Sequence, residues 1–113
     1  MGVKSELRKY LENGQAFSHG SADRLLDVQS AGRRLRELAQ EMDLYYFWTK
    51  GRRGSGYKVF ARKKNAFKVF KDPDTGLWFI QSMLRNEDYL IPVYSPPFKT
   101  KGQALKAIKR TNA

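Results

Sequence analysis

Two aromatic runs separated by a short glycine-rich segment constrain the fold of this chain more than any other feature. The runs span residues 44–48 and 57–61, and the segment between them, residues 50–56, holds three glycines and a serine. Short apolar runs on either side of glycines are typical of paired β-strands joined by a loop. The pattern therefore predicts a β-hairpin whose tip carries Lys50, Arg52 and Arg53.

The hairpin lies in the most basic part of the chain. Residues 44–71 contain nine Lys or Arg and no acid, so they hold nine of the eleven net positive charges. The nine are Lys50, Arg52, Arg53, Lys58, Arg62, Lys63, Lys64, Lys68 and Lys71. A charge excess this local indicates a surface that meets an anionic partner, and nucleic acid is the partner that it favours.

The composition narrows the remaining possibilities. The chain has 113 residues, 41% of them hydrophobic, which is enough for one domain or two very small ones. It has no cysteine and a single histidine, His19, so thiolate chemistry and histidine-rich metal sites are excluded. We expect no enzyme activity, no cofactor and no metal. No apolar run approaches the roughly 20 residues of a membrane span, so we expect a cytoplasmic, nucleoid-associated protein without membrane contact.

Two short helices are predicted before residue 30. Apolar residues at helical spacing run from Val3 to Leu11, and Asn13 and Gly14 then favour a helix end. A loop containing Phe17 and His19 follows. Ser21 is a suitable N-cap for a second helix of about two turns.

The third predicted helix is the best defined. It opens at Ser30, and its inward stripe is Ala31, Leu35, Leu38 and Met42. The opposite face carries Arg33, Arg34, Arg36, Glu37 and Gln40, with Gln29 just before the cap. Arg and Gln are the side chains that reach guanine and adenine edges in the major groove, so this face is suited to reading DNA.

The first half resembles a known family on these residues. Leu7, Tyr10, Leu11 and Gly14, then Ser18 and the run at 22–38 with Arg33-Arg34-Leu35-Arg36, are similar to small winged-helix proteins of phages and mobile elements. The resemblance covers roughly residues 3–63. It implies a winged helix-turn-helix fold, with the third helix in the major groove and the basic hairpin, the wing, on the flanking phosphates.

The second half predicts strands near 66–70, 77–84 and 89–94. Asp72 to Gly76 is a turn signal, and Pro92 places the last strand at a sheet edge. Thr100 with Gln103 forms a capping box for a final helix, whose inward residues would be Ala104, Leu105 and Ile108. This order, with Phe98-Lys99-Thr100-Lys101 entering the helix, is similar to sheet-reading DNA-binding modules of some recombinases and plant-type transcription factors.

The predicted fold is therefore α+β, an N-terminal winged helix-turn-helix at 1–64 followed by a small three-stranded antiparallel meander with a C-terminal helix at 66–113, packed on the first unit. We expect a non-enzymatic regulator of a phage or mobile element that binds double-stranded DNA. The expected binding residues are Gln29, Ser30, Arg33, Arg34, Glu37, Lys50, Arg52, Arg53, Lys58, Arg62, Lys63 and Lys64.

Two alternatives stay open. The basic surface could dock on an acidic protein partner, as an inhibitor of host machinery would, or the chain could bind RNA or single-stranded DNA. The aromatic residues at 45–48 are expected to lie mostly in the core, and any free face would serve base stacking. The sequence contains no heptad pattern that would indicate an oligomeric state.

Overall fold

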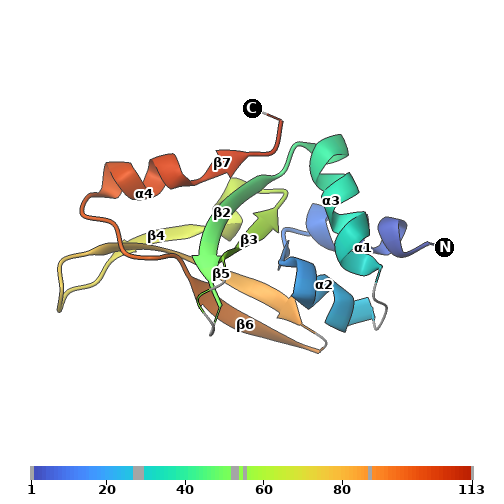
Figure 1. Cartoon of the computed structure of the whole chain (residues 1–113), viewed down its shortest axis with the longest axis horizontal. Coiled ribbons are helices and arrows are strands. Elements are labelled where there is room, and N and C mark those ends of the chain that lie inside the picture. The colour runs from blue at the N-terminus through green and yellow to red at the C-terminus, as the bar shows by residue number, and fades with distance from the viewer. Residues whose placement is uncertain (1, 27–29, 52–53, 55, 87, 113) are drawn as a thin grey trace.

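The computed structural model describes residues 2–26, 30–51, 54, 56–86 and 88–112. Its elements are α1 (Val3–Glu12), β1 (Ala16–Phe17), α2 (His19–Leu26), α3 (Ala31–Met42), β2 (Tyr45–Lys50), β3 (Gly56–Ala61), the 3-10 turn η1 (Lys64–Ala66), β4 (Lys68–Lys71), β5 (Trp78–Asn86), β6 (Tyr89–Tyr94), α4 (Lys101–Ala107) and β7 (Lys109–Arg110). Figure 1 shows α1, α2 and α3 grouped at one end of the molecule and α4 at the other, with the strands between them.

One curled, mixed sheet unites strands from both halves of the chain. Its order is β4-β5-β1-β3-β2-β7, and β6 lies on the free edge of β5. The short strand β1 makes the connection, because Ala16 pairs with Ala61 of β3 in antiparallel fashion and with Leu84 of β5 in parallel fashion. The basic hairpin β2–β3 is thus continuous with the strands that follow it.

The predicted architecture is wrong in how the strands are grouped, although the broad α+β class agrees. We expected a winged helix-turn-helix and a separate three-stranded meander, whereas seven strands of the described chain form one sheet. The two-residue strands β1 and β7 account for much of the difference. β1 joins β3 to β5, and β7 pairs with β2 at Tyr45 and Tyr46. Strands this short have no hydrophobic periodicity, so the sequence pattern does not reveal them.

Two apolar clusters lie on opposite faces of this sheet. On one face, α1 and α3 contribute Leu7, Leu35 and Leu38, which pack against Phe17 of β1 and Phe60 of β3. On the other face, Phe47, Val59, Phe67, Ile80 and Ala104 form the second cluster. Neighbouring residues of β3 therefore point to different cores, as the period of two requires.

The ends of the first two helices show which capping predictions hold. Gly14, at φ +88°, follows α1 where the sequence predicts its end. α2 begins three residues earlier than expected, at His19 instead of Ala22, and the predicted cap Ser21 lies inside it. The Ser21 N–H donates to Ser18 Oγ at 3.1 Å and the Ser18 N–H donates to Ser21 Oγ at 2.8 Å, so this reciprocal pair closes the helix start.

α3 begins at Ala31 as predicted, but a different side chain caps it. Ser30 occupies the N-cap position without making a side-chain capping bond among the described residues. Instead, Asp23 Oδ1 accepts the Gly32 N–H at 2.7 Å. An acid from α2 thus stabilises the positive end of α3 and fixes the angle between the two helices.

The second half confirms most of its local signals. Gly76, at φ +73°, donates its N–H to the Asp72 carbonyl at 2.8 Å, which closes the predicted turn. Pro92 lies on β6, whose ladder partner in the described chain is β5 alone, so it is an edge residue as predicted. Thr100 Oγ1 accepts the Gln103 N–H at 3.2 Å.

Two details of this half differ from prediction. β5 continues to Asn86, two residues past the expected end of the strand at 84. Leu105 was expected to face inward but is 41% exposed, because the short helix α4 buries only Ala104 fully.

Candidate nucleic-acid interface

α3 presents three different surfaces. Leu35 lies on the fully buried stripe. Arg34 and Glu37 are half-buried on the side that meets α1, whereas Arg33 is exposed. Arg36 is also exposed, and it lines a cleft between α3 and the β2–β3 hairpin. The predicted DNA-reading face is therefore divided. Arg34 and Glu37 meet α1, Arg36 lines the cleft beside the hairpin, and Arg33 is exposed to solvent.

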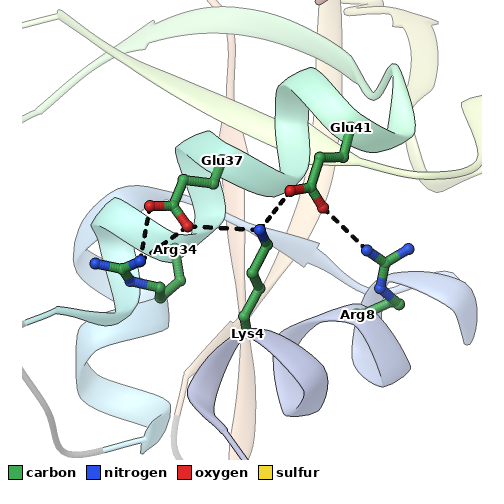
Figure 2. A network of polar contacts seen from close by, with 5 residues as sticks. All are labelled: Lys4, Arg8, Arg34, Glu37 and Glu41. Atoms are coloured by element: carbon green, nitrogen blue, oxygen red, sulfur yellow. Dashed lines mark hydrogen bonds and ion pairs between the residues drawn. The ribbon is translucent and has the colours of Figure 1, made fainter.

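The α1 side of α3 carries a network of ion pairs (Figure 2). Arg34 Nη1 contacts both Glu37 oxygens, at 2.7 and 2.9 Å, and Lys4 Nζ lies 3.6 Å from Glu37 Oε2. Glu41 accepts from Lys4 and, at 3.1 Å, from Arg8 Nη2. These side chains hold α1 against α3, and both carboxylates are matched by cations from inside the molecule.

The charges in this network reinforce one another. The hydrogen bond from Lys4 is the main reason that the pKa of Glu41 lies below its ordinary value, and attraction to Lys4 and Arg8 adds to it. The same hydrogen bond raises the pKa of Lys4. Arg34 and Glu37, two of the predicted binding residues, thus have an evident structural role between the helices.

The cleft on the other side of α3 encloses about 360 Å³. α2 and α3 form one wall and the outward side chains of the hairpin form the other. The lining residues are His19, Gly32, Leu35, Arg36, Trp48, Gly56, Tyr57, Lys58 and Phe60. Trp48 pairs with Lys58, and Lys50 with Gly56, so alternate residues of the two strands are directed to the same face.

Lys58, which lines this cleft together with Trp48, lies over two aromatic rings. The Lys58 ammonium lies 4.8 Å from the Tyr46 ring centroid and 5.3 Å from the Trp48 ring centroid, which is cation–π distance. Trp48 is 50% exposed, although its neighbour Phe47 is fully buried. An indole at the surface, held beside an ammonium group, is available to a flat aromatic ligand.

His19 and Gly32 belong to the wall of the cleft formed by α2 and α3. A Cβ at Gly32 would come within 2.4 Å of the His19 ring, so α2 and α3 approach closely only because residue 32 has no side chain. Asp23 joins the same contact, since its Oδ2 lies 3.5 Å from His19 Nδ1 while its other oxygen caps α3. The wall of the cleft is therefore built by the junction of these two helices.

The cations near the cleft lack the acidic partners that the cations beside α1 have. In the described parts of the chain, ion pairs to acids engage Lys4, Arg8, His19, Arg34 and Arg110. Arg33, Arg36, Lys50 and Lys58 have no such partner there, and of these only Lys58 is partly buried. Of these four, Arg36 and Lys58 line the cleft, so positive charge without an acidic partner faces it from both walls.

The remaining predicted residues are spread more widely. Lys50 ends β2 next to the hairpin tip, and Ser30 is exposed at the start of α3. Arg62 donates to the Met42 carbonyl at 3.3 Å, and Lys63 lies beside Gly14. β3 separates Arg62, Lys63 and Lys64 from the hairpin tip by roughly 20 Å, and none of the three lines the cleft. Gln29, Arg52 and Arg53 are outside the described residues.

A larger pocket of about 600 Å³ lies behind Tyr57, which together with His19 lines both cavities. Arg24 and Gly51 also line it. Burial raises the pKa of the Tyr57 hydroxyl, and the charge of Arg24 opposes that shift. Tyr57 therefore stays protonated at neutral pH and can donate a hydrogen bond.

Sequence reasoning missed four contributors to this site. Trp48 was expected to lie mostly in the core, Tyr57 was given no role, His19 had no evident nucleophile or metal partner, and Arg36 was left out of the expected contacts. The strand alternation of residues 46–50 could have indicated that Trp48 points outward with Lys50, away from Phe47. The position of His19 on Gly32 could not be inferred, since it depends on how two helices cross.

No family model, curated protein or solved structure matches this chain. In the part of the chain that the structure describes, no group of three or more acidic or histidine side chains could hold a metal ion. None of the described helices has the length and apolar character needed to cross a lipid bilayer.

Proposed function

We propose that this chain is a non-enzymatic DNA-binding protein that contacts duplex DNA through the exposed arginines of α3 and the basic hairpin β2–β3. The observation that supports it is that Arg36 and Lys58 line one cleft from opposite walls, α3 and the hairpin. Arg33 and Lys50 are exposed on the same two elements, and none of the four cations pairs with an acid among the described residues. On this proposal the protein would co-localise with the nucleoid.

The residues have different roles in such a complex. Arg33 is exposed on α3 and is the candidate for a base edge in the major groove, where arginine pairs with guanine. Lys50 and Lys58 on the hairpin, with Arg52 and Arg53 predicted at its tip, are candidates for phosphate contacts. Arg34 and Glu37 would support the interface indirectly by holding α3 on α1.

The proposal predicts a salt dependence that can be assigned to the cleft. Each neutralised phosphate contributes about 0.9 to the slope of log affinity against log salt. The double change Arg36→Ala with Lys58→Ala should therefore weaken duplex binding at low salt and flatten that slope by up to roughly 2. Mobility shifts of duplex DNA, single-stranded DNA and RNA of equal length, at two or more salt concentrations, measure both quantities.

A matched control removes two charges elsewhere. Lys99 and Lys106 are exposed near α4, at the other end of the molecule, and changing both to Ala should leave the slope as it is. Equal flattening in the two double variants would show that only net charge matters and would contradict the proposed interface. Tighter binding to RNA than to duplex DNA would also contradict it.

A further inference from the structure

The cleft between α3 and the hairpin has features that phosphate binding does not require. Its volume of about 360 Å³ falls within the range of ~300–1,000 Å³ that is typical of small-ligand pockets. Leu35 and Phe60 supply an apolar floor, and Arg36 and Lys58 supply a cationic rim. Of the described residues that line it, none is acidic. A planar, uncharged ring with a phosphate attached would match the apolar floor with its ring and the cationic rim with its phosphate.

Trp48 supplies a ring surface at the mouth of the cleft. A Cβ at Gly56 would lie 3.3 Å from Trp48 Cε3, so the indole packs over a glycine backbone. Trp48 as a whole remains 50% exposed, and Lys58 is placed over its ring and over Tyr46. The indole thus packs on the strand beneath it, while Trp48 stays accessible from the solvent.

Whether a base is paired determines whether it can stack on the Trp48 ring. In an intact duplex each base is stacked between its neighbours, so an aromatic side chain reaches a base face only when that base has left the stack. Extruding a paired base costs energy that an already unpaired base does not require. A stacking surface in a duplex-binding interface therefore selects DNA that carries an unpaired base.

We propose that the α3–hairpin cleft binds one unpaired DNA base, stacked on Trp48, with Arg36 and Lys58 on the adjoining phosphates. This inference rests on the proposed duplex binding and adds a preferred ligand, duplex DNA with an extrahelical base. Base stacking on an aromatic side chain corresponds to roughly 5- to 150-fold in affinity. The full chain should therefore bind a duplex with a single bulged thymine about tenfold more tightly than the fully paired duplex.

Three duplexes of the same flanking sequence test this: fully paired, with a bulged thymine, and with an abasic site at the bulge. Trp48→Ala should lower affinity for the thymine bulge about tenfold, to the level of the paired duplex, and Trp48→Phe should restore most of the preference. Tyr94→Ala is the matched control, because Tyr94 is also about half exposed, at 47%, but does not line this cleft. It should leave the bulge preference intact.

Fluorescence gives a second readout that does not depend on affinity. The chain has two tryptophans, so Trp78→Phe leaves Trp48 as the only indole. Emission of this variant should fall when the thymine bulge binds and stay nearly constant with the abasic bulge.

Each outcome has a defined meaning. Equal affinity for the thymine and abasic bulges would show that DNA bending, and not the base, is recognised, and would overturn the inference. Equal affinity for paired and bulged duplexes would overturn it too while leaving duplex binding in place. Failure of every duplex to bind would refute the proposed function itself.

Discussion

At the scale of single residues, glycines determine how closely the elements around the cleft approach one another. Gly32 lies under the His19 ring and Gly56 lies under the Trp48 ring. Both glycines have ordinary negative φ values, so backbone freedom does not require them. They matter because a Cβ at residue 32 would overlap the His19 ring, and one at residue 56 would lie in tight contact with the Trp48 ring, at 3.3 Å.

Gly32→Ala is predicted to destabilise the protein although alanine is the better helix former. The new methyl group would come within 2.4 Å of the His19 ring and must displace it, at a cost of about 1–3 kcal/mol for overpacking. Urea unfolding measures the change. Gly102→Ala in α4 is the control, since its methyl would meet only Thr100 Oγ1 at 3.9 Å and should stabilise by up to ~1 kcal/mol. Similar effects of the two changes would refute the contact.

At the scale of elements, α3 is positioned by charge on one side and by packing on the other. Lys4 and Arg8 of α1 bind Glu37 and Glu41 of α3 at the surface, whereas the buried stripe holds the helix on the sheet. Exposed ion pairs contribute little to stability individually, so the network mainly sets the orientation of α3 relative to α1.

The network nevertheless predicts a pH dependence. The pKa of Glu41 is lower in the folded state than its ordinary value of 4.5, chiefly because of its hydrogen bond with Lys4. Its contribution is therefore present above about pH 4.5 and disappears as the pH falls through the lowered pKa. Glu41→Gln should reduce stability at neutral pH and approach the wild type once the pH has fallen below the lowered pKa of Glu41, as unfolding measured from neutral pH down through an acid series will show. A constant difference between the two proteins would contradict this linkage.

At the scale of the whole molecule, the sheet makes the two halves of the chain interdependent. The rings of Phe47 and Phe67 meet edge-to-face with centroids 4.9 Å apart, across the predicted boundary near residue 65. Ala16, Val59 and Ala61 from the first half belong to the same apolar cluster as Ile80 and Leu84 from the second. The cleft thus depends on strands that come from far along the chain.

A fragment of residues 1–65 is predicted not to hold a stable tertiary structure. It would keep the helical cluster but expose the inner face of β2 and β3, including Phe47 and Val59, to water. A chain of ~65 residues also buries a smaller fraction of its surface on folding than a longer chain does. Near-ultraviolet circular dichroism and amide chemical-shift dispersion measure the loss. A fragment with cooperative unfolding would show that the halves fold separately, at the predicted boundary.

Much of the local structure was predictable because it depends on nearby residues. The bounds of α3, the hairpin β2–β3, the turn at Asp72 to Gly76 and the edge position of Pro92 agree with their sequence signals. The solvent exposure of Trp48 was harder to predict. The aromatic character of Trp48 suggested the core, whereas the residue is 50% exposed and lines the cleft beside α3.

The sequence by itself determined the elements and the concentration of positive charge, since helical stripes, strand alternation and turn residues act over a few positions. Only the tertiary structure decided that β1 joins the halves in one sheet, that Arg34 and Glu37 turn toward α1, and that Arg36 faces Trp48 and Lys58 across a cleft. These arrangements arise from contacts between residues distant in the chain. Such contacts form where they bury the most apolar surface and pair the most charge, and no local pattern encodes them.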